Sequence, residues 1–310
     1  MADVPARLAP GGRTAAGIAF DDEGSGPPVA LVHAGVADRR MWSELAATLR
    51  DRHRVIRHDV RGVGESLPPG GPWSHHTDLL GLLDELLITR AHLVGASMGA
   101  GIAVEAALAR PGTVASLMLV APGGALFDGA PASFRPIWAA EVEALDRGDL
   151  DTAVDINLRA WVDGPQRSAD AVDPAVRAFV GRMQREAFEL PQWDPDQAPE
   201  HELAPPAAAR LAELGCPVLV VTGELDDPAI LDVSERIAAT APRARLVVVP
   251  GVGHMLSLEQ PAVFADLLSA FLFDVTTGRF DGRPVEIPAS SGPEAEPTPR
   301  PAAEREPAAG

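Results

Sequence analysis

The sequence predicts an α/β fold: a doubly wound, mostly parallel sheet covered by helices on both faces, with a helical cap inserted between two of its strands. Two observations support this prediction. Short apolar runs recur along the chain, and each is followed by a helix-like pattern, which is typical of parallel strands that are buried on both faces. The alternation stops between Pro122 and Gly215, where the patterns are helical and no strand-like run occurs.

The first part of the chain alternates strands with helices. A continuous apolar run at Val29–His33 follows a Gly- and Pro-rich segment, as expected of a buried strand. The next helix is predicted from apolar residues spaced four apart, at Met41, Leu45 and Leu49. The same reasoning predicts strands at Val55–Asp59, His92–Gly95 and Val114–Val120, and helices at Met41–Leu49, Thr77–Leu87 and Met98–Ala109.

The middle of the chain predicts the inserted cap. Helical patterns cover Phe134–Asp146, Leu150–Val162 and Ala175–Phe188, and large aromatic residues are concentrated there. Ligands of open parallel sheets bind beyond the carboxyl ends of the strands, so a cap placed there would form the roof of a pocket. We therefore expect Trp138 and Trp161 to line a substrate pocket.

The last part of the chain returns to the alternating pattern, with strands predicted at Val218–Thr222 and Leu246–Val249 and helices at Ile230–Ala239 and Val263–Phe273. The segment after these elements is rich in Pro, Ala and acidic residues, a composition that buries no core. The expected organisation is a core at 1–122, a cap and linker at 123–215, the second part of the core at 216–278, and a disordered tail at 279–310.

Composition and charge exclude several classes of protein. The formal net charge of −18 disfavours a nucleic-acid or anionic-membrane surface. The sequence contains no Lys and no Tyr, which excludes Schiff-base chemistry and tyrosine acids. No Cys/His metal-ligand spacing, N-terminal apolar leader or long apolar stretch occurs. We therefore expect a cytoplasmic protein that needs no metal or cofactor; its oligomeric state is left open.

A G-x-S-x-G motif at Gly95–Gly99 supplies a candidate nucleophile, Ser97. The motif lies between a predicted strand and a predicted helix, the setting in which a sharp turn exposes a serine hydroxyl. Small residues are needed on either side of the serine because the turn brings strand and helix close together. The start of the helix also provides free N–H groups for an oxyanion, and the Met98 N–H is the first of these.

A serine nucleophile requires a base and an acid that orients it. His254 follows the strand Leu246–Val249 and precedes a helix, which makes it the best-placed of the eight histidines. The loop after Val218–Thr222 carries three acids, of which Asp226 is our choice to orient the imidazole. Asp227 and Glu224 remain alternatives.

A turn of small residues after the first strand completes the candidate site. The backbone N–H of Gly35 is expected to join that of Met98 in an oxyanion hole, with Val36 as the alternative donor. His33 and Val36, which flank this turn, are expected to line the substrate pocket.

These motifs resemble those of the α/β-hydrolase superfamily, over roughly residues 15–275. The order of Ser97, Asp226 and His254 is the order found in hydrolases with this serine turn. Asp59–Ser66 is similar to the family's D-x-R-G-x-G-x-S loop, and Gly253-His254 with Glu259–Pro261 resembles its G-H…E-x-P ending. Where the family usually has His-Gly, this chain has His33-Ala34-Gly35.

The resemblance implies a serine hydrolase that acts on a small ester, lactone or related acyl substrate through an acyl-enzyme. Family members with an Asp nucleophile or an essential Lys are excluded by Ser97 and by the absence of Lys. Carbon–carbon bond hydrolases and cofactor-free perhydrolases use the same three residues and remain alternatives. A catalytically silent ligand-binding protein on the same fold is the alternative from a different class.

Overall fold

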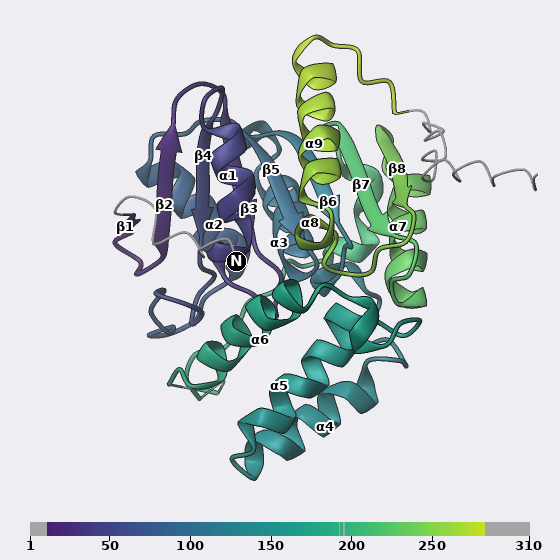
Figure 1. The fold of residues 1–310 in the computed structure, drawn as a ribbon. Helices are drawn as coiled ribbons and strands as arrows, with labels where there is room; N and C mark the ends of the chain where they lie inside the picture. Colours follow the sequence, from purple (N-terminus) through teal and green to yellow (C-terminus); the bar gives the residue numbers. More distant parts are fainter. Residues whose placement is uncertain (1–10, 192, 195, 283–310) are drawn as a thin grey trace, which may run out of the picture.

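The computed structural model describes residues 11–191, 193–194 and 196–282, which contain an eight-stranded sheet with helices on both faces (Figure 1). The strand order is β1-β2-β4-β3-β5-β6-β7-β8. At one edge β1 pairs with β2 and β2 pairs with β4, both antiparallel, and every pairing from β4 to β8 is parallel. The strands are β1 Gly12–Arg13, β2 Ala19–Gly24, β3 Pro28–Val32, β4 Arg54–His58, β5 Ala91–Ala96, β6 Val114–Val120, β7 Val218–Gly223 and β8 Ala244–Val249.

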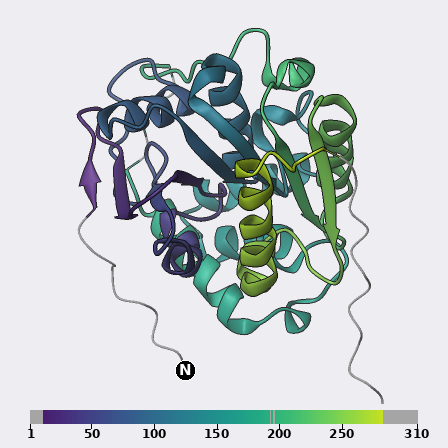
Figure 2. The same ribbon diagram turned by 90° about the horizontal axis from the view of Figure 1, so that it is seen from above.

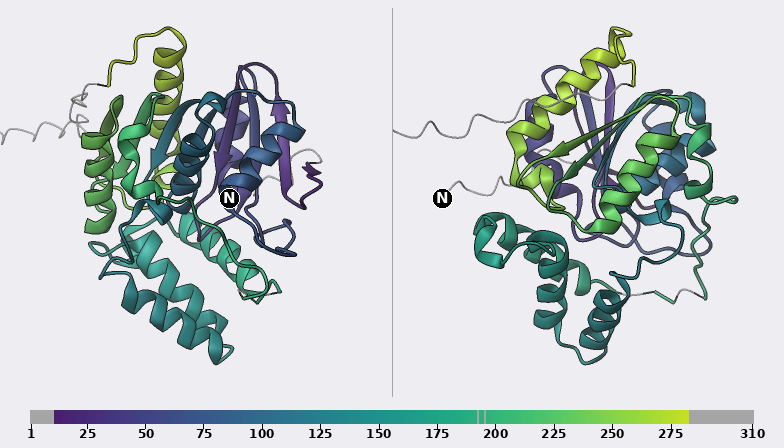
Figure 3. Two further views of the ribbon diagram at one scale, coloured as in Figure 1. Left: turned by 180° about the vertical axis from the view of Figure 1, so that it is seen from behind. Right: turned by 90° about the vertical axis from the view of Figure 1, so that its right-hand side faces the viewer.

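Helices cover both faces of the sheet, which confirms the predicted fold class (Figure 3). One face packs against α1, α8 and α9, and the other against α2, α3 and α7. The N-terminal strands and β8 lie at opposite edges of the twisted sheet (Figure 2). The bounds are α1 Ser43–Leu49, α2 His75–Glu85, α3 Met98–Ala109, α7 Pro228–Thr240, α8 Leu256–Glu259 and α9 Pro261–Thr276.

The central strands are apolar along their whole length because both of their faces are buried. In β3, Val29 and Leu31 belong to the core on one face, whereas Ala30 and Val32 belong to the core on the other. Parallel pairing places the carboxyl ends of β3 to β8 along the same side of the sheet, at the ends of the strands. The loops that follow these ends are therefore neighbours in space although they are far apart in sequence.

The antiparallel edge was not predicted from the sequence. β2 contains Asp21, Asp22 and Glu23 in succession, so no apolar run marks it as a strand. Arginines on β4 compensate these charges: Arg54 Nη2 lies 2.7 Å from Asp22 Oδ2, and Arg57 Nη2 lies 2.9 Å from Glu23 Oε1. Cross-strand ion pairs thus stabilise this strand, which has no hydrophobic pattern by which the sequence could reveal it.

Three helices lie between β6 and β7, beyond the carboxyl ends of the parallel strands (Figures 1 and 3). We refer to α4 (Arg135–Asp146), α5 (Leu150–Leu158) and α6 (Pro174–Phe188) as the cap helices. α5 continues into a π-helical turn at Arg159–Asp163. Within the part of the chain that is described, no helix is long and apolar enough to cross a membrane.

The end of the described chain is packed rather than free. Phe280 falls within the segment expected to be a disordered tail, yet it is buried and its ring centroid lies 5.1 Å from that of Phe271 on α9. The guanidinium of Arg245 lies over the same ring, 4.9 Å from its centroid. The structured core therefore includes residue 280, and the remainder of the expected tail, 283–310, is outside the described residues.

The Phe280→Ala variant should be clearly less stable than the parent protein. Loss of a buried ring that packs on Phe271 is expected to lower the free energy of unfolding by about 3 kcal/mol. Urea denaturation followed by tryptophan fluorescence measures this change. Phe273→Ala is the matched control, since the Phe273 side chain is half exposed, and a loss of the same size in both variants would contradict the packing argument.

Candidate active site

Ser97 lies at the turn between β5 and α3 in a strained backbone conformation. Its φ of 52° and ψ of −116° are rare for a residue with a side chain. Neighbouring backbone holds it there: the Ser97 N–H donates to the carbonyl of Val120 (2.8 Å), and its carbonyl accepts from the Gly123 N–H (3.1 Å). The side chain is half-buried and lines a cavity.

The glycines around Ser97 are required by the close approach of the strand and the helix. A Cβ atom at Gly95 would lie 2.2 Å from the carbonyl oxygen of Gly99, and one at Gly99 would lie 2.4 Å from that of Val32. Both contacts are with backbone atoms, so no side-chain movement relieves them. The G-x-S-x-G pattern is thus explained by sterics at this turn.

His254 and Asp226 form a buried pair at the carboxyl ends of β8 and β7. The Nδ1 of His254 lies 2.9 Å from Asp226 Oδ2 and 3.1 Å from Oδ1, and both side chains are 2% exposed. The Nδ1–H group donates a hydrogen bond to the carboxylate, which leaves Nε2 as the unprotonated nitrogen of the neutral ring. Such a ring can accept a proton from a nucleophile at its other edge.

The other two acids of this loop have structural partners. Asp227 Oδ1 accepts from the Ala229 N–H (2.8 Å) and so caps the N-terminus of α7. Glu224 is exposed, and its Oε2 accepts from the Gly251 N–H at 3.1 Å. Only Asp226 contacts the imidazole among the three candidates that the sequence left open.

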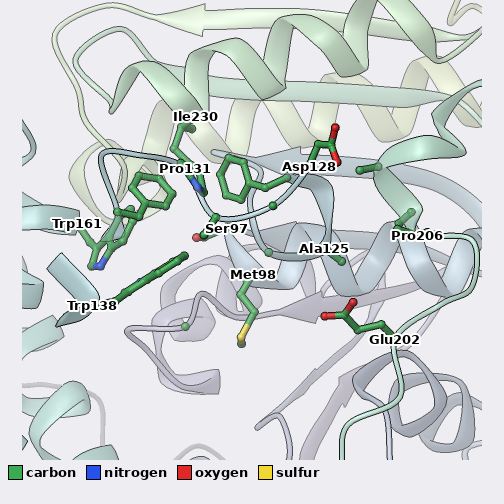
Figure 4. A pocket seen from close by; sticks show the side chains of 18 of the residues that line it. Ser97, Met98, Ala125, Asp128, Pro131, Trp138, Trp161, Glu202, Pro206 and Ile230 are labelled. Carbon is green, nitrogen blue, oxygen red and sulfur yellow. The ribbon is translucent and has the colours of Figure 1, made fainter. Parts of the chain in front are cut away.

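Ser97 and His254 line the same cavity, which has a volume of about 750 Å³ (Figure 4). Val36, Trp138 and Trp161, which the sequence predicted to line a substrate pocket, also line this cavity. In Figure 4, Trp138 and Trp161 lie on one side of Ser97, whereas Ala125 and Pro206 lie on the other. The Trp161 ring lies 5.1 Å from that of His254, so the π-helical extension of α5 reaches the catalytic candidates directly.

Gly35 and Met98 lie close together beside the turn that carries Ser97. Both line the cavity, and a Cβ atom built on Gly35 would lie 3.8 Å from the Met98 Sδ. Met98 is the first residue of α3, where backbone N–H groups have no acceptor within the helix. The positive end of the helix dipole is at the same place, which suits a developing oxyanion.

The expectation that His33 lines the pocket was wrong. Its ring is fully buried and is absent from the cavity wall. Nδ1 donates to the Ala34 carbonyl (2.8 Å), and Nε2 accepts from the Val60 N–H at 2.9 Å. Both nitrogens are used, so His33 joins the loop after β3 to the loop after β4 and holds the Gly35 turn in place.

The cavity also has charged and polar walls that the sequence analysis missed. Four carboxylates and one guanidinium belong to the described lining: Glu105, Asp128, Glu141, Glu202 and Arg236. None of these five charged residues lies in a sequence motif. The polar residue Asn157 also lines the cavity, and its position four residues before Trp161 was the one signal that the sequence offered for this wall. The described residues contain no cluster of His, Cys, Asp or Glu side chains arranged to hold a metal ion.

A buried ion pair connects the His254 loop to the cap side of the molecule. Arg167, which follows the π-helical turn, donates from Nη2 to Glu259 Oε1 (3.2 Å) and to the Val162 carbonyl (2.9 Å). The same Glu259 oxygen accepts from the Gly253 N–H (3.2 Å), next to His254. The side chains of Arg167 and Glu259 are 8% and 9% exposed, so the pair is shielded from water.

With this fold and site, the chain belongs to the alpha/beta hydrolase family, whose model matches residues 29–267. It is 30% identical over 272 residues to the 2-hydroxymuconate semialdehyde hydrolase of Pseudomonas sp. (strain CF600), an alignment that covers 81% of this chain and 88% of the relative.

Solved structures of hydrolases with the same fold support this assignment. An N-acyl homoserine lactone degrading enzyme, Est816, superposes with a TM-score of 0.64 at 26% identity, covering 82% of this chain and 96% of its own. A thermophilic esterase from Thermogutta terrifontis superposes with a TM-score of 0.63 at 27% identity, covering 83% and 93%. The chain is therefore related to hydrolases that act on different substrates.

Proposed function

We propose that the protein is a serine hydrolase that cleaves a small ester or lactone through an acyl-enzyme. The observation that carries the proposal is that Ser97 and His254 line one cavity while Nδ1 of His254 bonds to the buried Asp226 (2.9 Å). A hydroxyl, an imidazole and a carboxylate in this relation are the groups that nucleophilic acyl transfer requires.

In the proposed reaction, His254 Nε2 takes the proton of Ser97 as the hydroxyl oxygen attacks the carbonyl carbon. The backbone N–H groups of Gly35 and Met98 stabilise the resulting oxyanion, and Val36 is the alternative to Gly35. The tetrahedral intermediate collapses, the carbon–oxygen bond of the ester breaks, and His254 gives its proton to the leaving alcohol. Water then attacks the acyl-enzyme in the same way and releases the acid. Asp226 keeps His254 in one tautomer and stabilises the imidazolium.

Carbon–carbon bond hydrolysis is the second candidate, because the relative that is 30% identical is named for such a substrate, hydroxymuconate semialdehyde. The cavity charge favours the first candidate. A muconate is a carboxylate, and the described lining of the cavity contains Glu105, Asp128, Glu141 and Glu202 against Arg236, a negative balance that disfavours an anionic substrate. A neutral or cationic acyl substrate avoids this repulsion.

The test is a substrate panel with a covalent label. We expect turnover of p-nitrophenyl esters or of lactones, and stoichiometric labelling of Ser97 by a fluorophosphonate, located by peptide mass spectrometry. Turnover of 2-hydroxymuconate semialdehyde in preference to all esters and lactones would favour the second candidate. No turnover and no label at Ser97 would overturn the enzymatic proposal in favour of a ligand-binding protein.

A further inference from the structure

The cap end of the cavity combines aromatic rings with polar side chains. Trp138 and Glu141 are three residues apart on α4, while Asn157 and Trp161 are four residues apart on α5 and its π-helical extension, so each pair shares a helix face. All four line the cavity, together with Gln184 from α6. The cap helices thus contribute a defined wall rather than isolated contacts.

Glu141 is held in place as a hydrogen-bond acceptor. The Nδ2 of Asn157 donates to Glu141 Oε2 and also to the carbonyl of Ala153 (3.1 Å), which fixes the amide between helix and carboxylate. Burial raises the pKa of Glu141, and the bond from Asn157 opposes that rise. A cation beside this carboxylate would favour its ionised form.

Gln184 adds an acceptor that lacks a donor. The residue is 6% exposed, and its Oε1 is itself buried and has no hydrogen-bond partner among the described residues. Buried amide oxygens are nearly always satisfied, and Gln184 is one of the residues that line the cavity, which makes this oxygen an acceptor for a donor on a bound molecule.

Aromatic rings connect this wall to the catalytic candidates. Phe134 contacts Trp138 and Trp161 edge to face, with ring centroids 5.7 and 4.8 Å apart, and Trp161 extends to His254 at 5.1 Å. Indole faces attract cations even at exposed sites, and Trp138 is 42% exposed whereas Trp161 is more buried. The wall therefore offers a carboxylate, an amide oxygen and indole rings, which together suit a donor that carries a positive charge.

We propose that the cap end of the cavity, formed by Glu141, Gln184 and Trp138, binds a protonated primary amine on the substrate, remote from the bond that Ser97 attacks; Trp161 lies between this end and His254 through its ring contacts with Phe134 and His254. The inference deepens the proposed function and rests on it. Phe134 and Glu141 are seven residues apart, or roughly 10 Å along the axis of α4. Phe134 packs on Trp161, and the Trp161 ring lies beside His254. An amine held by Glu141 is therefore separated from the reacting carbonyl by a chain of several atoms.

The kinetic test compares p-nitrophenyl 8-aminooctanoate with p-nitrophenyl nonanoate, which has the same chain length and no charge. The amino ester should have at least about tenfold higher kcat/KM, and Glu141→Gln or Gln184→Leu should each reduce this preference about ten- to a hundredfold. Glu143→Gln is the matched control: it lies on the same helix, its side chain is 75% exposed, and it pairs with Arg147. An equal preference in Glu141→Gln and the parent protein, with Gln184→Leu also unchanged, would overturn the proposal.

The 8-trimethylammonio ester separates charge from hydrogen bonding, because it keeps the positive charge and donates no hydrogen bond. It should be a poorer substrate than the primary amine, and Gln184→Leu should abolish the difference. If the two cations are turned over equally in the parent protein, the hydrogen-bonding role assigned to Gln184 is wrong.

A binding measurement distinguishes failure of the amine site from failure of the proposed function. Calorimetry on the Ser97→Ala protein should show tighter binding of n-hexylamine than of hexanoate, with the difference lost in a Ser97→Ala/Glu141→Gln double variant. This result would support the amine site even if no ester were hydrolysed, whereas tighter binding of hexanoate would overturn it.

Discussion

The Ser97→Ala variant is expected to lose ester turnover by a factor on the order of 10⁴ to 10⁶, because no other group in the proposed mechanism can form the acyl-enzyme. The fold should be unaffected. The backbone bonds that hold position 97, to Val120 and Gly123, involve main-chain atoms that alanine retains. Steady-state kinetics on the best p-nitrophenyl ester measures the loss, and thermal unfolding shows that the variant is folded.

A second serine variant provides the control for this experiment. Ser168 lies on the surface beyond the cavity and bonds to Asp170, so Ser168→Ala should keep the activity of the parent protein. If Ser97→Ala were folded and retained turnover within about tenfold of the parent, the acyl-enzyme mechanism would be refuted. If Ser168→Ala lost activity as well, the loss would reflect a general property of the preparation rather than the nucleophile.

The Asp226→Asn variant is expected to reduce kcat by about 10⁴-fold with little change in KM. An asparagine amide can donate to Nδ1, which would move the ring proton to Nε2, the nitrogen that must accept the serine proton. The variant also removes the negative charge that stabilises the imidazolium. Fluorophosphonate labelling should slow in parallel, because it depends on the same activated serine.

The two neighbouring acids make this test specific. Asp227→Asn retains a side chain that caps helices well, and Glu224→Gln changes an exposed residue that bonds to Gly251, so both should keep near-parental turnover. A loss in either variant as large as that in Asp226→Asn, with the fold intact, would mean that the orienting acid has been assigned incorrectly.

Much of the fold could be predicted because its strands and helices carry strong local patterns. The helix at Met98–Ala109 and the strand at Val114–Val120 were predicted with their observed bounds. β2 escaped prediction because its stability depends on Arg54 and Arg57, which come from a strand distant in sequence. Phe280 was assigned to a tail for a related reason. The residues around it in the sequence are mostly polar, and only the tertiary contact with Phe271 reveals that it is buried.

The candidate site was predictable where its chemistry imposes short-range constraints. The glycines around Ser97 are needed by backbone approach, so they leave a sequence motif. His33 was misassigned because its place after a strand resembles that of a pocket residue, and only the bond to Val60 shows its structural role. Glu141 and Gln184 could not have been found, since they line the cavity from separate helices and follow no short motif.

The buried contact between Arg167 and Glu259 has a consequence for how this protein could diverge. It attaches the C-terminal end of α5 and its extension to the loop that carries His254, whereas the pocket residues Trp138 and Glu141 lie on α4, outside that attachment. The α4 helix still contacts the attached unit, through Glu141 with Asn157 and through Phe134 with Trp161. Trp138 takes part in neither of these contacts, so its position is where natural variation or directed evolution should alter substrate choice at least cost to the reaction.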